Sequence, residues 1–179
     1  MGGDLNLALA YGALGASSGW ALMQCTDLMY ARVAFGVYLA TGIVGVVDYF
    51  TSRSKVKEML TAIARWSMTL YLPLIAAEAI LYAGYETIYA YCHLVLPILY
   101  LVLTELLKKN LRRDLLELAI VVSAVSLCFS AIISEDVFGG LCVLVNLMAF
   151  FSVNYNSREY FLLIAIAQIA AVQFFKHLI

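Results

Sequence analysis

Residues 60–83 read LTAIARWSMTLYLPLIAAEAILYA, and this stretch decides the fold class. Only two of its side chains, Arg65 and Glu78, are charged. A helix of about 20 mostly apolar residues is long enough to cross the ~30 Å hydrocarbon layer of a bilayer. The stretch therefore predicts a transmembrane helix.

The whole chain has the same character. Of its 179 residues, 64% are hydrophobic and 13% are charged, whereas charged residues make up about 25% of an ordinary soluble domain. This composition leaves too little polar surface to cover a globule in water. The 11 basic and 12 acidic residues nearly cancel, which argues against a nucleic-acid partner. The bilayer is the expected partner.

Apolar runs of nearly the same length occur on both sides of residues 60–83. Together they give seven candidate spans, at residues 5–25, 33–50, 60–83, 87–107, 115–133, 138–155 and 160–175. The runs are too long and too continuous for barrel strands. We predict an all-α, polytopic bundle of about seven transmembrane helices that forms a single domain over residues 1–179. The runs 33–50 and 138–155 are among the shortest, and a re-entrant segment is an alternative for either.

The distribution of Lys and Arg predicts an orientation. Most basic residues follow the second, fourth and sixth runs: Arg53, Lys55, Lys57, Lys108, Lys109, Arg112, Arg113 and Arg158. Short loops rich in Lys and Arg stay on the cytoplasmic side. We therefore expect a cytoplasmic N-terminus and a lumenal or extracellular C-terminus, in either the plasma membrane or an endomembrane.

A short sequence similarity suggests an internal repeat. Residues 47–53 read VDYFTSR, and residues 153–158 read VNYNSR, so similar sequences close the second and sixth runs. This predicts a 3+1+3 plan of parallel pseudo-repeats, 5–83 and 115–179, joined by a helix at 87–107. A chance similarity between membrane segments is the alternative.

Two ionisable side chains lie inside the predicted spans near prolines. Glu78 follows Pro73, and His93 precedes Pro97 in the next run. A charge at the centre of an inserting helix costs about 2.5–3.5 kcal/mol, so such groups usually mark a cavity or a partner. If the two helices are antiparallel neighbours, Glu78 and His93 lie at similar depth and form a proton-relay or ligand element. A structural Glu–His pair, or a hydrated carboxyl group near the interface, is the alternative.

Further polar residues extend this candidate path. Asn146 and Gln168 lie in the middle of their predicted spans, and Tyr71 lies near Pro73. They line an axial cavity with Glu78 or, alternatively, form hydrogen bonds between helices. Asp48 and Asn154 take equivalent places at the ends of the second and sixth runs, where they cap a helix, bind Arg53 or Arg158, or gate the path.

Small residues are concentrated in the first two runs. They include a GxxxG pair, Gly15 and Gly19, together with Gly12, Gly42 and Gly45. Glycines let helix backbones approach closely. The pattern predicts tight packing of the first two helices, or a face for a homodimer or for a larger membrane-protein partner.

Motifs for metal, cofactor or covalent chemistry are missing from the sequence. The four cysteines and two histidines lack metal-ligand spacing, and nucleophile and phosphate-loop motifs are absent. We expect no cofactor and no metal, and we favour a non-enzyme. The leading hypothesis is a transporter or channel for a small solute or ion. The alternatives are a non-transporting accessory or regulatory subunit and an intramembrane lipid-modifying enzyme that uses Asp48, Glu78 or His93.

Overall fold

The computed structural model describes residues 4–51, 53–108, 113–155 and 157–178. Seven α-helices and no β-strand occur in these residues, which confirms the all-α prediction for this part of the chain. The helices are α1 (Leu5–Gln24), α2 (Met29–Thr51), α3 (Ser54–Tyr82), α4 (Thr87–Leu101), α5 (Asp114–Ile133), α6 (Val137–Ser152) and α7 (Arg158–Leu178). A π-helical turn, η1 (Val102–Leu106), continues α4.

Five of these helices have the length and composition needed to cross a membrane. They are α2, α3, α4 together with η1, α5 and α7. α6 is apolar but short. The mean hydropathy of α1 is lowered by the polar residues Asn6, Ser17, Ser18 and Gln24. The structure is therefore consistent with a membrane helical bundle, but only five of the seven expected spans meet these criteria.

The second helix differs from the sequence prediction in its length. We expected a short span over residues 33–50, with a re-entrant segment as the alternative. α2 instead begins at Met29 and is continuous for 23 residues. The reason is a carboxylate from α3 that binds its first turn, as described below.

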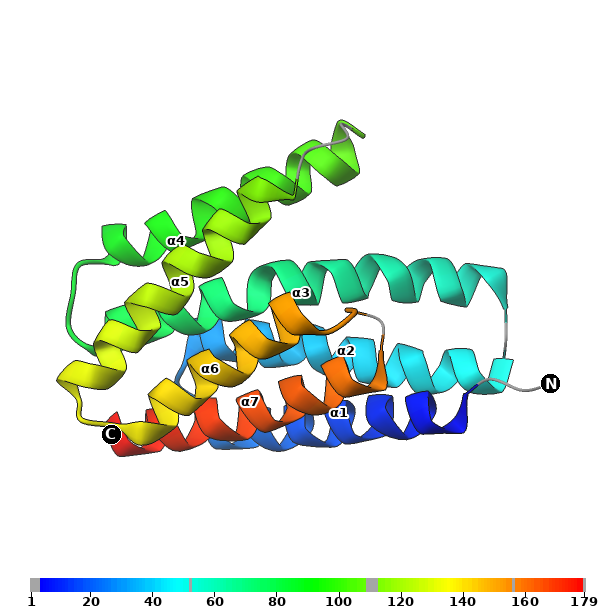
Figure 1. Cartoon of the computed structure of the whole chain (residues 1–179), viewed down its shortest axis with the longest axis horizontal. Helices are drawn as coiled ribbons and strands as arrows, with labels where there is room; N and C mark the ends of the chain where they lie inside the picture. Colours follow the sequence, from blue (N-terminus) through cyan, green and yellow to red (C-terminus); the bar gives the residue numbers. More distant parts are fainter. Residues whose placement is uncertain (1–3, 52, 109–112, 156, 179) are drawn as a thin grey trace.

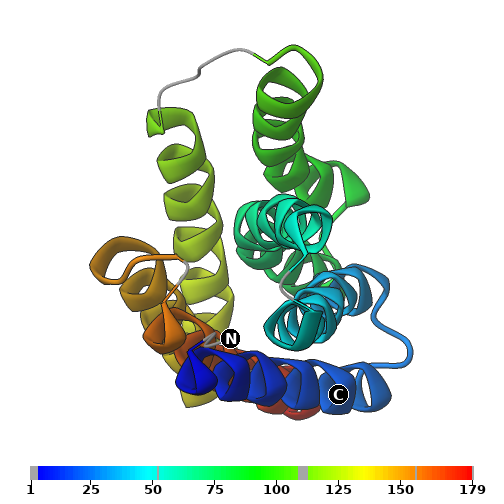
Figure 2. The same ribbon diagram turned by 90° about the vertical axis from the view of Figure 1, so that its right-hand side faces the viewer.

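The helices form a ring in chain order. Each helix packs against the next one, α7 returns to pack against α1, and α3 also contacts α5 across the ring. Figure 1 shows that successive helices run in opposite directions and that the two termini lie at opposite ends of the bundle. Figure 2, a view along the bundle, shows α4 and α5 extending away from the layer formed by α1 and α7. The 3+1+3 repeat stays a prediction, because the order of the helices around the ring does not show whether residues 5–83 and 115–179 have the same fold.

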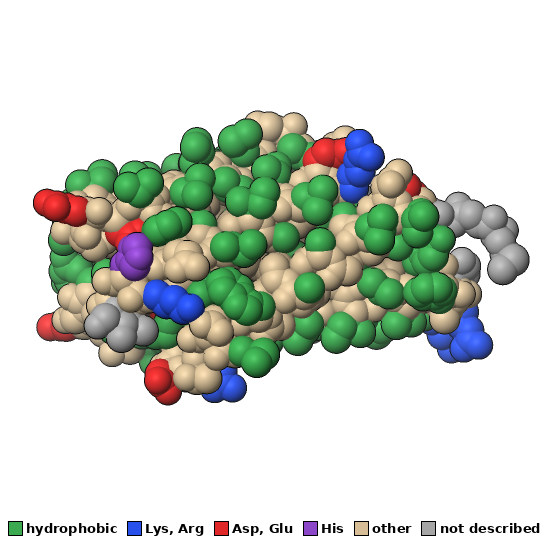
Figure 3. Space-filling view, turned by 90° about the horizontal axis from the view of Figure 1, so that it is seen from below, with side chains coloured by type: hydrophobic (Ala, Val, Ile, Leu, Met, Phe, Trp, Pro, Cys, Tyr) green, Lys and Arg blue, Asp and Glu red, His purple; other side chains and the backbone are tan. Residues whose placement is uncertain are grey.

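The outer surface is apolar between two charged ends. Large hydrophobic side chains are exposed on all seven helices, including Phe50, Val125 and Ile132. On the face shown in Figure 3, hydrophobic side chains cover the middle, and acidic and basic side chains gather toward the two ends. This distribution suggests membrane insertion. The predicted orientation also used Lys109 and Arg112, and the repeat used Ser52 and Asn156, all of which lie outside the described residues.

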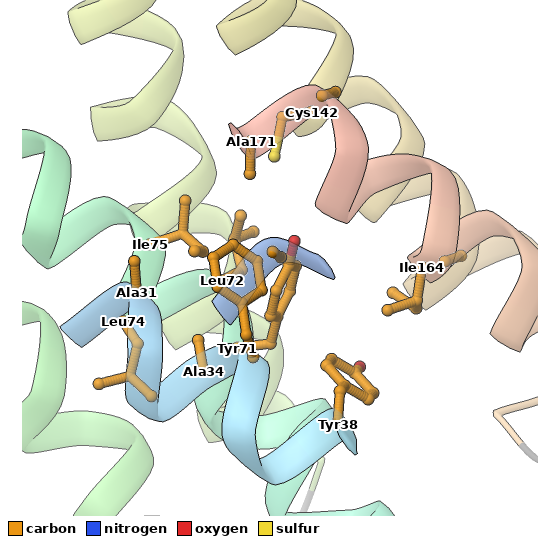
Figure 4. Packing of buried hydrophobic residues seen from close by; sticks show 14 of the residues in the cluster. Ala31, Ala34, Tyr38, Tyr71, Leu72, Leu74, Ile75, Cys142, Ile164 and Ala171 are labelled. Carbon is orange, nitrogen blue, oxygen red and sulfur yellow. The ribbon is translucent and has the colours of Figure 1, made fainter. Parts of the chain in front are cut away.

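Aromatic side chains fill the centre of the bundle. The rings of Tyr38 and Tyr71 meet edge to face, with centroids 5.1 Å apart, and both side chains are buried. Figure 4 shows Tyr71 extending from α3 toward Cys142 of α6 and Ala171 of α7. This packing joins α2 and α3 to the opposite side of the ring.

Candidate functional site

Glu78 binds the beginning of α2. Its side chain is buried, and its Oε2 accepts hydrogen bonds from the backbone N–H groups of Tyr30, at 2.5 Å, and Ala31, at 3.0 Å. The first N–H groups of a helix have no partner within the helix, and Leu28, just before α2, has no side-chain acceptor. Glu78 therefore caps α2 from α3 and also interacts favourably with the positive end of its dipole.

His93 lies on α4, the neighbour of α3, but it forms a separate site. The described contacts contain no hydrogen bond between His93 and Glu78. The His93 Nδ1 atom is buried without a hydrogen-bond partner, and the side chain lines a groove between α4 and α5. The two ionisable groups that we expected to act together thus have different surroundings.

Gln168 joins α7 to α1. Its Oε1 accepts hydrogen bonds from Ser17 Oγ, at 2.6 Å, and from Ser18 Oγ, at 3.0 Å. Both serine hydroxyls are also within 3.0 Å of the Leu14 carbonyl oxygen, which can accept in place of Gln168. The Gln168 Nε2 atom is buried without a partner. This contact is of the interhelical type that the sequence offered as the alternative to a path.

Tyr71 and Asn146 line the same small void at the centre of the bundle. The void has a volume of about 10 Å³, which is about the space that one water molecule requires. Asn146 Nδ2 donates to the Cys142 carbonyl oxygen at 2.8 Å, and the Tyr71 hydroxyl has no partner. Tyr38 and Tyr160 complete the polar lining, with their hydroxyl oxygens 2.9 Å apart. Glu78, His93 and Gln168 do not line this void.

Asp48 and Asn154 lie near the end of the bundle that carries the N-terminus. Asp48 is half-buried in the last turn of α2, and Asn154 is exposed in the turn before α7, where its carbonyl accepts from the Ser157 N–H at 2.9 Å. Arg158, an expected partner, forms its ion pair with the adjacent Glu159. Asp48 and Asn154 thus lie at helix ends, as their sequence positions indicate.

The glycines divide into two groups. A Cβ atom on Gly42 would lie 2.7 Å from both Cα and N of Gly15, and one on Gly45 would overlap the Tyr11 ring, so these glycines permit the close packing of α1 and α2. A Cβ atom on Gly12 would have nothing within 4 Å, and one on Gly19 would meet only Leu39 Cδ1, at 3.9 Å. Gly12, but not Gly19, lines the α1–α2 groove, a hollow of about 320 Å³ lined by Tyr11, Gly12, Gly15, Ala16, Leu39, Gly42, Ile43, Val46 and Val47.

Besides the Tyr38–Tyr160 contact, the sequence analysis missed two polar contacts that join distant residues. Asp136 caps α6 through Phe138 N–H and Gly139 N–H, at 2.6 and 3.1 Å, and its other oxygen lies 2.8 Å from His177 Nδ1. An aspartate just before an apolar run is a recognisable N-cap signal, but its pairing with the last turn of α7 has no local signal. The second contact is an ion pair between Arg65 of α3 and Glu105 of η1, at 2.5 Å.

No cluster of three or more His, Cys, Asp or Glu side chains that could hold a metal ion occurs in the described part of the chain. The four cysteines are free thiols, and Cys25 and Cys142 are buried. Comparisons of the chain with protein-family models, with curated proteins and with solved structures found no match. The contacts described above are therefore the basis for a functional proposal.

Proposed function

We propose that this multi-pass membrane protein is a non-transporting accessory or regulatory subunit whose α1–α2 groove binds a transmembrane helix of a larger membrane protein. The observation that carries the proposal is the groove itself. Gly12 and Ala16 form an open, small-residue lining at a place where the backbones of α1 and α2 are already in close contact. Surfaces of this kind let an additional helix pack closely, which is how helices associate in a bilayer.

The composition of α1 supports this proposal. Although α1 has 20 residues, it is not among the helices that are apolar enough to span a membrane alone. Its outward face includes Gly12, Ala13 and Ala16, whose small side chains offer little contact to acyl chains. A partner helix over the groove would supply those contacts and cover the exposed small residues of α1.

The interior also favours an accessory role over transport. The residues predicted to line a path are divided between a helix cap, a groove, an interhelical hydrogen bond and a one-water void. A transport path requires that such groups share a continuous cavity, and these residues do not share one in this conformation.

Site-specific crosslinking in native membranes tests the proposal. A photo-crosslinking residue at Ala16 should capture one larger membrane protein, and Gly12→Leu should abolish this product by filling the groove. Gly140→Leu on α6 is the matched control, because a Cβ atom at Gly140 also has nothing within 4 Å. Depletion of the protein should then lower the abundance or activity of the captured partner. Crosslinks only to lipid or to a second copy, or equal crosslinking by both variants, would refute the proposal.

Transport of a small solute or ion is the second candidate, and one observation favours it. Two buried polar atoms, Tyr71 Oη and Gln168 Nε2, have no partner, as expected if they bind a solute in another conformation. In that conformation Glu78, His93 and Asn146 would join the path. Saturable flux in liposomes of the purified protein, lost in Asn146→Leu and altered in Glu78→Gln, would support transport and contradict a purely accessory role.

We also propose a cytoplasmic N-terminus. The described residues Arg53, Lys55, Lys57, Lys108, Arg113 and Arg158 are near the end of the bundle that carries the N-terminus, whereas Arg32 and Lys176 are near the other end with several acidic residues. Selective permeabilisation of the plasma membrane should make an N-terminal epitope accessible to antibody. A C-terminal epitope should be accessible in intact cells if the protein is in the plasma membrane, and only after the organelle membrane is permeabilised if it is in an endomembrane.

A further inference from the structure

A second groove lies between α4 and α5, away from the α1–α2 groove. This α4–α5 groove has a volume of about 480 Å³, within the range of sites that bind small molecules. Its lining comes from α3, the α3–α4 connection, α4 and α5, and consists of Ile80, Tyr85, Tyr89, Cys92, His93, Val125, Ser126, Phe129 and Ser130.

The position of the groove restricts its occupant to molecules of the bilayer. Tyr85 and Tyr89 lie at the end of the bundle, where an aromatic belt meets the headgroups, and His93 lies about 6 Å beyond Tyr89 along α4 at 1.5 Å per residue. Val125 and Phe129, which are 63% and 58% exposed, form the opposite wall and open the groove toward the acyl chains. A ligand with a polar group near the interface and a chain directed into the bilayer fits this arrangement.

The surroundings of His93 determine what the polar group must be. Either neutral tautomer leaves the buried Nδ1 atom without a partner, but buried N–H groups without a partner are rarer in proteins than buried acceptors without one, so we place the proton on Nε2. His93 then offers one N–H donor to a ligand, and the matching ligand group is an oxygen acceptor.

The charge of the lining selects among lipids with such an oxygen. None of the nine lining residues is Lys, Arg, Asp or Glu. An anionic headgroup would find no counter-charge in the groove and would lose hydration on entering it. An uncharged lipid with an ester carbonyl satisfies the donor without this cost.

We propose that the α4–α5 groove binds an acyl chain of an uncharged glycerolipid, with the adjoining ester carbonyl accepting a hydrogen bond from His93 Nε2. The chain lies against Ile80, Val125 and Phe129. The groove is a binding site rather than a hydrolytic one: the Ser130 hydroxyl donates to the Ser126 carbonyl oxygen at 3.1 Å, and the described contacts contain no His–Ser hydrogen bond that would activate a nucleophile.

Photo-labelling of the full chain in phosphatidylcholine nanodiscs tests this proposal. The probe is a diacylglycerol with a diazirine midway along one acyl chain, and its control is the ether analogue, which lacks the carbonyl. The wild-type protein should be labelled on α4 and α5 peptides at least fivefold more by the ester probe than by the ether probe. Equal labelling by the two probes, or labelling mainly of other helices, would overturn the proposal without the need for any variant.

Two substitutions then test the donor. His93→Leu should lower ester labelling to the level of the ether probe, whereas His93→Gln, which keeps an N–H donor, should stay within twofold of the wild type. Gly12→Leu, in the other groove, should have no effect. Unchanged labelling in His93→Leu, or stronger labelling by a phosphatidic acid probe with the same chain, would contradict the assignment of an uncharged, hydrogen-bonded ester.

Discussion

α1 and α4 show opposite relations between composition and burial. Five of the 20 residues of α1 are buried, although α1 is not apolar enough to be a membrane span by itself. α4 with η1 meets the criteria for a span, yet only three residues of α4 and none of η1 are buried. In a water-soluble protein the more apolar helix would be the more buried one. Here α1, the less apolar of the two helices, is slightly more buried than α4 with η1, as expected where apolar side chains face lipid.

The two sides of the bundle also differ in how their helices are held. The α1–α2 side uses backbone contact at Gly15 and Gly42, and the α1–α7 contact adds the hydrogen bonds of Gln168. The α4–α5 side contains the larger groove, and the Arg65–Glu105 ion pair joins η1, the continuation of α4, to α3 rather than to α5. We therefore expect the α1–α2 side to be the rigid part of the molecule and the α4–α5 side to be the part that ligands enter.

Gly42→Leu should have the largest effect, because it breaks the rigid side. The new side chain would collide with Gly15 Cα and N, which are backbone atoms and cannot turn aside. Overpacking in well-filled cores costs about 1–3 kcal/mol and more in some cases, and we expect the upper end of this range. Thermal unfolding in detergent should show a clear loss of stability. Gly12→Ala is the control and should change stability by less than about 0.5 kcal/mol; equal effects of the two variants would show that the helices can separate at Gly42 without loss.

Glu78→Ala should have the next largest effect. It removes the carboxylate that accepts from the first turn of α2 and leaves two N–H groups without a partner. We expect a loss of about 2–3 kcal/mol, because hydrogen bonds to charged groups are strong and buried orphan donors are costly. Glu78→Gln keeps an acceptor oxygen and should lose less.

The matched control for Glu78 lies on α5. Glu117 pairs with Arg113 at 3.2 Å, but both side chains are about half-exposed, so Glu117→Ala should cost less than about 0.5 kcal/mol. Hydrogen exchange at the first turn of α2 should increase in Glu78→Ala and not in Glu117→Ala. Protection of this turn in Glu78→Ala would mean that the cap is not what fixes the start of α2.

Much of the fold could be predicted from the sequence, because apolar runs and short polar loops are local signals. Those signals placed all seven helices, and Asp136 illustrates a cap that is readable from adjacent residues. The start of α2 could not be predicted in this way, because its acceptor, Glu78, lies 47 residues after Ala31. A helix that is capped by a distant side chain has no recognisable start in its own sequence.

The candidate site was less predictable for the same reason. Glycine spacing identified α1 and α2 as closely packing helices, but it did not show which glycines face inward. The partners of Gln168 are about 150 residues away, on the helix that closes the ring. Polar residues inside spans could be found from the sequence, whereas their distribution among separate sites depends on the ring order of the helices.

Gln168→Leu should have a small effect, although the residue is fully buried. The substitution removes the Nε2 group, which has no partner, and the hydroxyls of Ser17 and Ser18 keep their contacts with the Leu14 carbonyl oxygen. Interhelical polar contacts in bilayers average about 0.6 kcal/mol, so we expect a change in unfolding free energy below about 1 kcal/mol. A loss above about 2 kcal/mol would indicate that Nε2 binds a water molecule or solute, which would strengthen the transport alternative.

Thiol labelling requires no substitution and compares the two sides directly. Cys92 is exposed and lines the α4–α5 groove, whereas Cys25 is buried at the end of α1. Burial limits the access of reagents to the Cys25 thiol and disfavours its reactive thiolate. N-ethylmaleimide should therefore modify Cys92 first. The rate of modification of Cys25 should rise about tenfold per pH unit up to the pKa of the thiol, because the fraction of thiolate rises by the same factor.

If Cys25 reacts as fast as Cys92 at pH 8, the α1 side opens readily, and the contrast between a rigid and an open side fails. If added diacylglycerol slows Cys92 and leaves Cys25 unchanged, the contrast is sharpened, because a ligand then enters only the side with few buried contacts.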